Sequence, residues 1–322
     1  MRLLCLCGIA AVFMSGCGQT VVSYDNPYDI YSTSADYGLA SEGAGSEKTY
    51  FSQNLCVADD VNIGNDTTDS QVAEGAGTFN LATNTVTYAQ NIYEKLYPAR
   101  TTKILTAYIA LKYGNLEDYV TVSENAADQA SDSSVCGLKA GDVVQLKDLL
   151  YGMMLKSGND AAIAIAEHIG GSVEGFADMM NQEALAMGAS RSHFVNPNGL
   201  PDENHYTSVY DLYLIFQNAV QDQTFLDIIS TMSYDVVYTD VNGAGVERTW
   251  ENTNQYLTGK EKAPEGITVV GGKTGTTSMA GSNLILYSKN SNGNSYISVV
   301  MHASDSFSLY SQMSHLLELE NQ

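Results

Sequence analysis

Residues 137–176 have the sequence GLKAGDVVQLKDLLYGMMLKSGNDAAIAIAEHIGGSVEGF. Apolar residues recur every three to four positions over 146–155 and 160–169, and this period predicts two helices. The tripeptide Ser157-Gly158-Asn159 lies between them. The stretch therefore predicts a helical subdomain with a serine and an asparagine at the junction of two helices.

Two more motifs stand on either side of this stretch. Residues 98–103 read PARTTK, and Lys103 lies near the start of a helix predicted over 101–113. Downstream, Lys273-Thr274-Gly275 follows GITVVGG and is predicted to lie on an edge strand, along which an extended peptide could bind. Each motif is common by itself, but three motifs in this order and at this spacing are a strong signal.

The motifs suggest acyl-transfer chemistry. Residues at i and i+3 share one face of a helix, so a neutral lysine amine can take the proton of a hydroxyl three residues earlier. A serine and an asparagine two residues apart supply a proton-relaying hydroxyl and an amide that holds the substrate backbone. A lysine on the strand can bind a carboxylate.

The remaining patterns predict an α+β fold. A hairpin over 77–81 and 85–89 precedes the Lys103 helix, and two more helices are expected over 173–187 and 209–219. Beyond residue 230 the pattern changes to strands, and a last helix covers 307–319. We expect an antiparallel sheet flanked by helices plus a helical subdomain, with the active cleft between them. The strands beyond residue 230 are predicted over 234–238, 247–250, 268–272, 283–288 and 295–302.

Residues 72 to 305 resemble the serine-type D-alanyl-D-alanine carboxypeptidases, the low-molecular-mass penicillin-binding proteins. The three motifs carry the resemblance, together with HFVNPNGLPDENHYTSVYDL (193–212) and GGKTGTTSMAG (271–281). It implies a β-lactamase/transpeptidase-like fold and peptidoglycan stem peptides ending in D-Ala-D-Ala as substrates. The roles that it implies are Lys103 as general base, Ser157 as proton relay, Asn159 as holder of the substrate amide, Lys273, Thr274 and Gly275 as the carboxylate-binding segment, and the N–H of Thr276 as oxyanion donor.

One position departs from the family pattern. The family has Pro-Ala-Ser-x-x-Lys, so Arg100 stands where the acylated serine is expected. A guanidinium cannot serve as this nucleophile. Arg100 could point outward, could bind anions in a peptide pocket, or could come from a change in the sequence. Its backbone N–H could still form an oxyanion pocket with that of Thr276.

No other residue replaces the missing nucleophile. Thr101 and Thr102 lie off the face of the helix that carries Lys103. Cys136 stands three residues before Lys139, but in a predicted loop. Two functions therefore remain open. The chain is a carboxypeptidase with impaired turnover, or it is a pseudoenzyme that binds stem peptides as a cell-wall sensor or scaffold and binds β-lactams without a covalent bond.

The first 17 residues predict export. A short apolar run after Arg2 ends in Met14-Ser15-Gly16-Cys17, which resembles a lipoprotein signal with lipid attached to Cys17; a plain secretory signal is the alternative. Residues 18–71 are predicted to be a disordered acidic tether, and residues 72–322 the catalytic-type domain. The expected location is extracytoplasmic, anchored in the bacterial membrane and facing the wall. We expect no room for the additional C-terminal domain and amphipathic anchor of many family members.

Composition excludes one class of partner. The chain has 37 acidic and 15 basic residues and a net charge of −22, so we expect no nucleic-acid partner. Its five histidines lack metal-ligand spacing, so we expect no metal and no cofactor. Cys56 and Cys136 could pair in an oxidising compartment, or both could stay free.

Overall fold

The computed structural model describes residues 54–64 and 73–321, all within one compact unit of the chain. The predicted signal, Cys17 and most of the predicted tether lie outside these residues. Within the described part of the chain, no helix is both long and apolar enough to cross a membrane.

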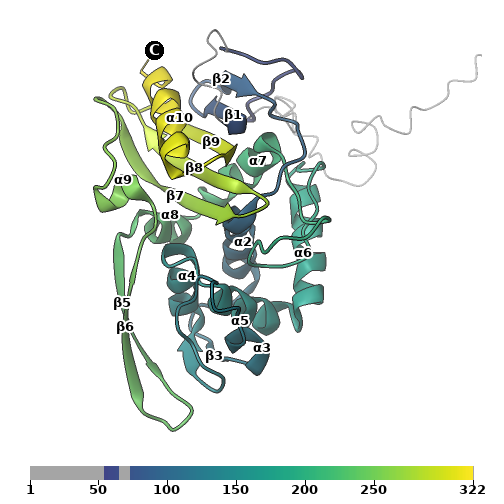
Figure 1. Ribbon diagram of the computed structural model, residues 1–322, viewed down its shortest axis with the longest axis vertical. Coiled ribbons are helices and arrows are strands. Elements are labelled where there is room, and N and C mark those ends of the chain that lie inside the picture. Colours follow the sequence, from purple (N-terminus) through teal and green to yellow (C-terminus); the bar gives the residue numbers. More distant parts are fainter. Residues whose placement is uncertain (1–53, 65–72, 322) are drawn as a thin grey trace, which may run out of the picture. The chain divides into compact units, whose positions relative to one another are not determined.

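A five-stranded antiparallel sheet forms the first layer (Figure 1). Its order is β2-β1-β9-β8-β7, so β7 is an edge strand, as predicted for the segment with Lys273. The strands are β1 (Ala73–Asn80), β2 (Thr85–Gln90), β7 (Thr268–Thr277), β8 (Gly281–Lys289) and β9 (Ser295–Ala303).

Alternating side chains bury both faces of this sheet. On β8, Leu284 and Leu286 pack toward helix α10 (Ser306–Leu319), whereas Ile285 joins the main core on the opposite face. This period of two is what a strand covered on both sides requires. Helices α7 (Val209–Ala219) and α8 (Gln223–Ser230) cover the second face.

The helical subdomain lies beside the sheet. It contains α3 (Glu124–Ala127), α4 (Leu146–Leu155), α5 (Asn159–Gly170) and α6 (Val173–Ala186). Helix α2 (Lys103–Tyr113) contacts α4, α5 and α6 of the helical subdomain. It also contacts α7 and α8, which cover the sheet, so α2 connects the helical subdomain to the sheet layer. A short helix α9 (Gln255–Thr258) precedes β7.

The expectation of one sheet was wrong. A second antiparallel sheet has the order β3-β4-β5-β6, and its strands are β3 (Tyr119–Thr121), β4 (Val143–Gln145), β5 (Ser233–Thr239) and β6 (Gly245–Glu251). Val236 and Trp250 are buried, and both strands of the hairpin contact α4. Alternation identified β5 and β6 as strands, but it carries no information about which strand pairs with them.

Residues 54–64, predicted as part of the tether, are folded onto the domain. Cys56 is fully buried, its backbone N–H donates to the Tyr213 hydroxyl at 2.9 Å, and its thiol donates to the Asn80 carbonyl at 3.3 Å. Ile63 forms an antiparallel bridge with Ala89. Cys56 and Cys136 are both free and buried, so the disulfide between them does not form.

Candidate active site

The segment before helix α2 is a tight 3₁₀ turn, η2 (Ala99–Thr102). Residues at i and i+3 eclipse each other in such a turn, which brings Arg100 and Lys103 to one side. Ala99 has a positive φ of 48°. Two glycines hold the turn: a Cβ on Gly199 would lie 1.8 Å from the Ala99 carbonyl oxygen, and one on Gly275 would lie 2.8 Å from the Arg100 nitrogen. The predicted helix over 101–113 therefore begins as α-helix only at Lys103.

Lys103 is fully buried at the start of α2. Its Nζ donates to Asn159 Oδ1 at 2.7 Å and to the Asn198 carbonyl at 2.7 Å. Burial, followed by the positive charges of Lys273 and Arg100, holds the pKa of Lys103 well below its ordinary value. This environment favours the neutral amine, the form that can accept a proton.

Ser157 faces Lys273 rather than capping helix α5. Its φ is +63°, and its Oγ accepts a hydrogen bond from Lys273 Nζ at 2.9 Å. The N-cap of α5 is Gly158, without a side-chain cap, so neither Ser157 nor Asn159 acts as a simple helix cap. The Asn159 Nδ2 is buried and has no hydrogen-bond partner. A substrate carbonyl is the kind of acceptor that this amide lacks.

Asp160 fixes the loop of residues 136–138, which packs against Gly158, a function that the sequence did not reveal. Its carboxylate accepts the backbone N–H groups of Cys136, Gly137 and Leu138 at 2.9, 3.0 and 3.1 Å. The Cys136 thiol is buried, and burial followed by the charge of Asp160 raises its pKa well above the ordinary value. A thiol held in this form is a poor nucleophile.

Lys273 is buried on β7, so it is not an ordinary strand lysine. Burial, followed by the charge of Arg100, lowers its pKa to about 7. Its Nζ also donates to the Thr274 carbonyl at 2.9 Å. The Thr274 hydroxyl is hydrogen-bonded to that of Thr253 at 2.6 Å, and Thr276 is exposed farther along the same strand.

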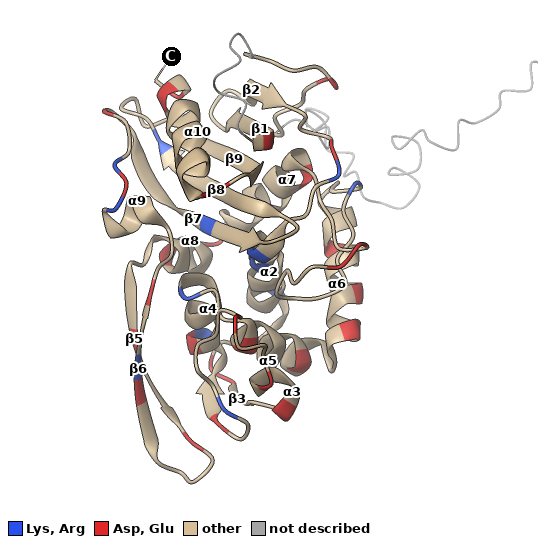
Figure 2. Cartoon of the chain, viewed as in Figure 1, with Lys and Arg blue, Asp and Glu red and all other residues tan. Residues whose placement is uncertain are grey.

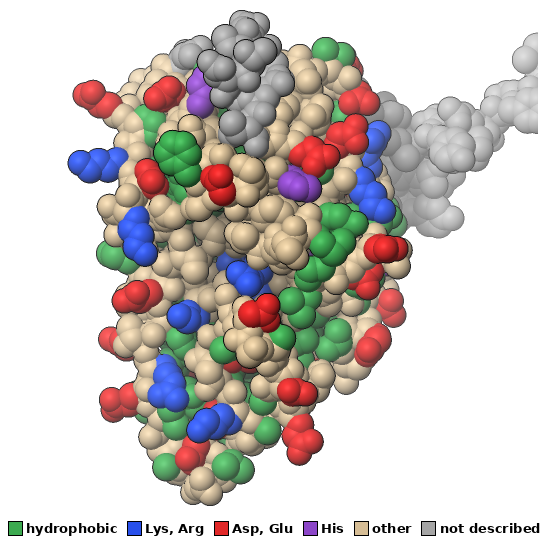
Figure 3. All heavy atoms as spheres, viewed as in Figure 1, with side chains coloured by type: hydrophobic (Ala, Val, Ile, Leu, Met, Phe, Trp, Pro, Cys, Tyr) green, Lys and Arg blue, Asp and Glu red, His purple; other side chains and the backbone are tan. Residues whose placement is uncertain are grey.

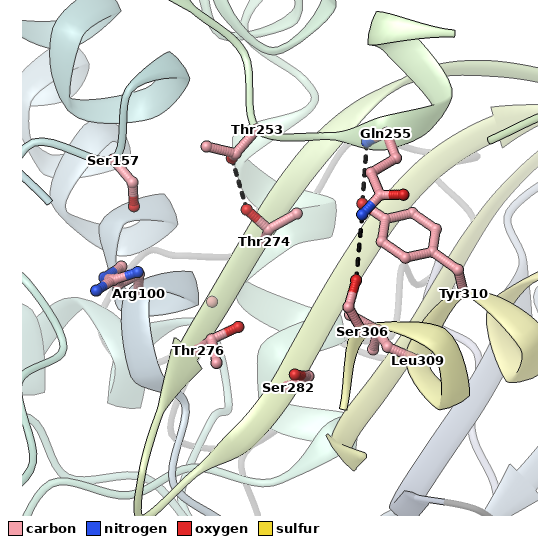
Figure 4. Close-up of a pocket in the computed structure, with 11 residues that line it drawn as sticks. Arg100, Ser157, Thr253, Gln255, Thr274, Thr276, Ser282, Ser306, Leu309 and Tyr310 are labelled. Carbon is pink, nitrogen blue, oxygen red and sulfur yellow. Dashed lines mark hydrogen bonds between the residues drawn. The ribbon is translucent and has the colours of Figure 1, made fainter. Parts of the chain in front are cut away.

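Arg100, Ser157, Thr274, Gly275 and Thr276 line a pocket of about 210 Å³, whereas the buried Lys103, Asn159 and Lys273 lie behind its wall (Figure 4). Arg100 and Ser157 lie on one side, across from Thr274 and Thr276. Arg100 is half-buried and lines this pocket, which disfavours the first of its three interpretations, an arginine that points outward. The pocket has no acidic residue in its wall, whose members are Arg100, Ser157, Thr253, Gln255, Thr274, Gly275, Thr276, Ser282, Ser306, Leu309 and Tyr310.

Positive charge is concentrated here in an acidic protein. Basic residues (blue) mark β7 and the start of α2 near the centre of the picture. Helices α3, α5 and α6 carry mainly acidic residues (red) (Figure 2). In the space-filling view, some basic side chains lie near the middle of this face with an acidic side chain beside them, and others lie at its edges (Figure 3). The site therefore offers a local positive potential to an anionic ligand.

The two threonines on the turn are occupied elsewhere. Thr101 Oγ1 donates to the Pro98 carbonyl at 2.7 Å, and Thr102 Oγ1 lies 2.8 Å from His205 Nε2. His205 Nδ1 accepts the N–H of Val195, so its Nε2 carries the proton and donates to Thr102. Burial lowers the pKa of His205 to about 4, which keeps the ring neutral. His205 thus supports the turn as a buried donor, not as a base.

Over residues 54–64 and 73–321, no group of three or more His, Cys, Asp or Glu side chains is arranged to hold a metal ion. The expectation that the protein needs no metal or cofactor stays a prediction.

A family model and several known proteins match a large part of the chain. The D-alanyl-D-alanine carboxypeptidase family model matches residues 65–305. D-alanyl-D-alanine carboxypeptidase DacA of Haemophilus influenzae is 36% identical over 219 residues, which cover 66% of this chain and 52% of that protein. DacF of Bacillus subtilis is 36% identical over 154 residues, covering 46% of this chain and 39% of that protein. This chain thus spans about half or less of the length of these two relatives.

The fold agrees with a solved structure. The crystal structure of the Streptomyces K15 DD-transpeptidase has a TM-score of 0.72 and 28% sequence identity, and the match covers 77% of this chain and 97% of that chain. The expected α+β architecture is therefore confirmed. Its sequence, the order of its motifs and its fold together assign this chain to the D-alanyl-D-alanine carboxypeptidase family.

Proposed function

We propose that the protein binds peptidoglycan stem peptides that end in D-alanine, and that Arg100 blocks the covalent step of the carboxypeptidase reaction. The observation that carries the proposal is the position of Arg100. It lines the pocket on the same turn as Lys103, while the hydrogen bonds of Lys103 to Asn159 and of Lys273 to Ser157 are in place. Peptide binding needs the residues that these two hydrogen bonds hold in place. Acylation needs them too, and it also needs a nucleophile at position 100.

The peptide-binding roles follow the edge strand. An extended peptide can add to β7, the edge strand of the sheet, by main-chain hydrogen bonds. We assign the holding of the peptide amide to Asn159, and the binding of a carboxylate to Lys273, Thr274 and Thr276. The backbone N–H groups of Arg100 and Thr276 form the oxyanion pocket in this proposal.

The covalent step can be written for a serine at position 100. Lys103 would take the proton of the serine hydroxyl as its oxygen attacks the carbonyl carbon. The C–N bond to the leaving residue, or of a β-lactam ring, then breaks, and Ser157 passes a proton to the departing nitrogen. Arg100 offers no atom for the first bond, so we propose a binding role, as a wall sensor or scaffold, with little or no turnover.

Intact-protein mass spectrometry after incubation with benzylpenicillin tests this function. We expect a penicilloyl adduct on the Arg100→Ser variant and none on the unaltered protein. An adduct on the unaltered protein would show that another residue is acylated and that the covalent step is not blocked. The lack of an adduct on a correctly folded Arg100→Ser variant would contradict the roles given to Lys103 and Ser157.

We also propose that lipid on Cys17 anchors the protein outside the cytoplasmic membrane. The support is the apolar run of residues 3–13 and the cysteine that follows it. Mass analysis of the mature N-terminus, with Cys17→Ser as control, tests this: a mature chain that begins after Cys17 would contradict lipidation.

A further inference from the structure

Within the residues that the structure describes, Arg100 has no hydrogen-bonded or ion-paired anion in the pocket. Burial lowers its pKa and the charge of Asp132 acts to raise it, but Asp132 lies outside the pocket wall. The Nε of Arg100 is buried and meets no hydrogen-bond acceptor. None of the salt bridges among the described residues includes it, and no carboxylate lies in the pocket wall. Placing a charge in a partly buried site without a partner is costly, so the site is better satisfied when an anion is bound.

The surroundings of Arg100 further favour the binding of an anion. Lys103 and Lys273 lie close enough that Arg100 lowers the pKa of both. The pocket wall around Arg100 presents hydroxyls, with Ser157 on the same side as Arg100 and Thr274 and Thr276 across from it. A guanidinium with hydroxyl donors around it matches the planar, two-oxygen geometry of a carboxylate.

The location of Arg100 decides which carboxylate would bind. This step rests on the proposed function, in which the peptide lies along β7 with its reacting carbonyl between Lys103 and Ser157. The carboxylate of a terminal D-alanine would then lie farther along, at Thr274 and Thr276. One residue of extended chain separates the two positions by roughly 3.3–3.6 Å.

A peptide that has already lost its last D-alanine has a different end group at this point. Its new terminal carboxylate stands where the longer peptide has a neutral amide. The carboxylate would meet Arg100 in a charge-assisted hydrogen bond, whereas the amide offers only a carbonyl oxygen and also must fit beside the guanidinium. Arg100 thus raises the binding affinity of the trimmed peptide and lowers that of the peptide ending in D-Ala-D-Ala.

We propose that this pocket preferentially binds trimmed stem peptides, with the carboxylate of the single remaining D-alanine on Arg100, over peptides that end in D-Ala-D-Ala. The protein then recognises the product of a carboxypeptidase reaction rather than its substrate. The reaction that supplies this ligand is the hydrolytic removal of a terminal D-alanine by an active enzyme.

Calorimetric titration of three peptides into the full-length protein tests the preference. The probes are N-acetyl-L-Ala-D-γ-Glu-L-Lys-D-Ala, the same peptide with one more D-Ala, and the first peptide with a C-terminal amide. We expect the trimmed acid to bind at least about tenfold more tightly than either of the others, which corresponds to one charge-assisted hydrogen bond.

Two variants locate the cause. Arg100→Gln keeps a polar side chain but removes the charge, and it should lower the affinity for the trimmed acid about tenfold or more and abolish the preference. Lys289→Gln removes an exposed positive charge at the far end of β8 and should change neither. Circular dichroism confirms that each variant is folded, and the comparison of peptides on the unaltered protein needs no variant.

The outcomes separate the two proposals. Binding of both acids with equal affinity, or tighter binding of the D-Ala-D-Ala peptide, would overturn the preference and leave the proposed peptide-binding function standing. Retention of the preference in Arg100→Gln would also overturn it. If neither acid binds at millimolar concentration, the proposed function itself fails.

Discussion

Lys273 Nζ lies 2.9 Å from Ser157 Oγ, a hydrogen bond that joins the edge strand β7 to the start of helix α5 across 116 residues of sequence. On the other side of Ser157, Asn159 accepts a hydrogen bond from Lys103 on helix α2 at 2.7 Å. The two lysines therefore tie the sheet and the helical subdomain to one three-residue segment.

Lys103 should be required for any acylation that a serine restores. In the Arg100→Ser background, Lys103→Met should slow penicilloyl-adduct formation by about 10² to 10⁴, the usual contribution of a general base. Asn159→Ala should slow it about tenfold by removing one substrate contact. The measurement is the rate of adduct formation by mass spectrometry. Lys147→Met, which removes an exposed lysine of α4, is the control, and a rate unaffected by Lys103→Met would contradict the base assignment.

Binding of carboxylate peptides should strengthen as the pH falls through about 7. The pKa of Lys273 is lowered to about 7, so this residue gains its proton and positive charge below that pH. A carboxylate ligand stays ionised down to about pH 4.5. Affinity measured by titration calorimetry from pH 8.5 to 5.5 should rise, with uptake of protons on binding. In Lys273→Met the profile should become flat; an unchanged pH profile would show that Lys273 does not bind the carboxylate.

Gly199 should tolerate no side chain, because a Cβ there would lie 1.8 Å from the carbonyl oxygen of Ala99. Gly199→Ala should lower the free energy of unfolding by about 2 kcal/mol more than Gly171→Ala, as expected for a steric clash in a packed site. Gly171 is the matched control because it also has a positive φ, 73° against 80°, but no atom within 4 Å of its would-be Cβ. Chemical denaturation measures both, and equal losses would show that the Ala99 turn can move.

Glu320 should make the protein more stable as the pH falls from about 7 to 4.5. Its carboxyl is fully buried and accepts hydrogen bonds from Ser288 and Ser298, and burial raises its pKa to about 7 from 4.5. The folded state therefore binds a proton in this interval that the unfolded state lacks. The gain amounts to about 3 kcal/mol at most.

The comparison with Glu320→Gln isolates this effect. The variant has no titrating carboxyl, so the difference in free energy of unfolding between it and the unaltered protein should change sharply between pH 8 and 4.5. The buried His205, elsewhere in the protein, contributes in the opposite direction, because its pKa is lowered to about 4 and its stability contribution falls below pH 6.5. A difference between the two proteins that is independent of pH would contradict the shifted pKa of Glu320.

Local patterns were sufficient for most single elements. The predicted bounds of α4 and α7 agree with the structure, and the residues of β5, β8 and β9 were predicted to within about two positions. These segments have a clear apolar period, which depends only on near neighbours in the sequence. The short elements α3, β3, β4, α8 and α9 were not predicted. The strands β3 and β4 are three residues long, too short to show a period, whereas α3, α8 and α9 each begin at a local side-chain cap that the sequence analysis overlooked.

The amino-acid sequence by itself determined the family, the order of the three motifs and the presence of an arginine three residues before Lys103. These are properties of residue identity and spacing. Only the tertiary structure decided that β5 and β6 form a separate sheet, that residues 54–64 pack on the domain, and that Asp160 and His205 support the site. It also decided that Arg100 faces the pocket with its Nε unpaired, because the direction and burial of a side chain depend on segments that meet only in the folded chain.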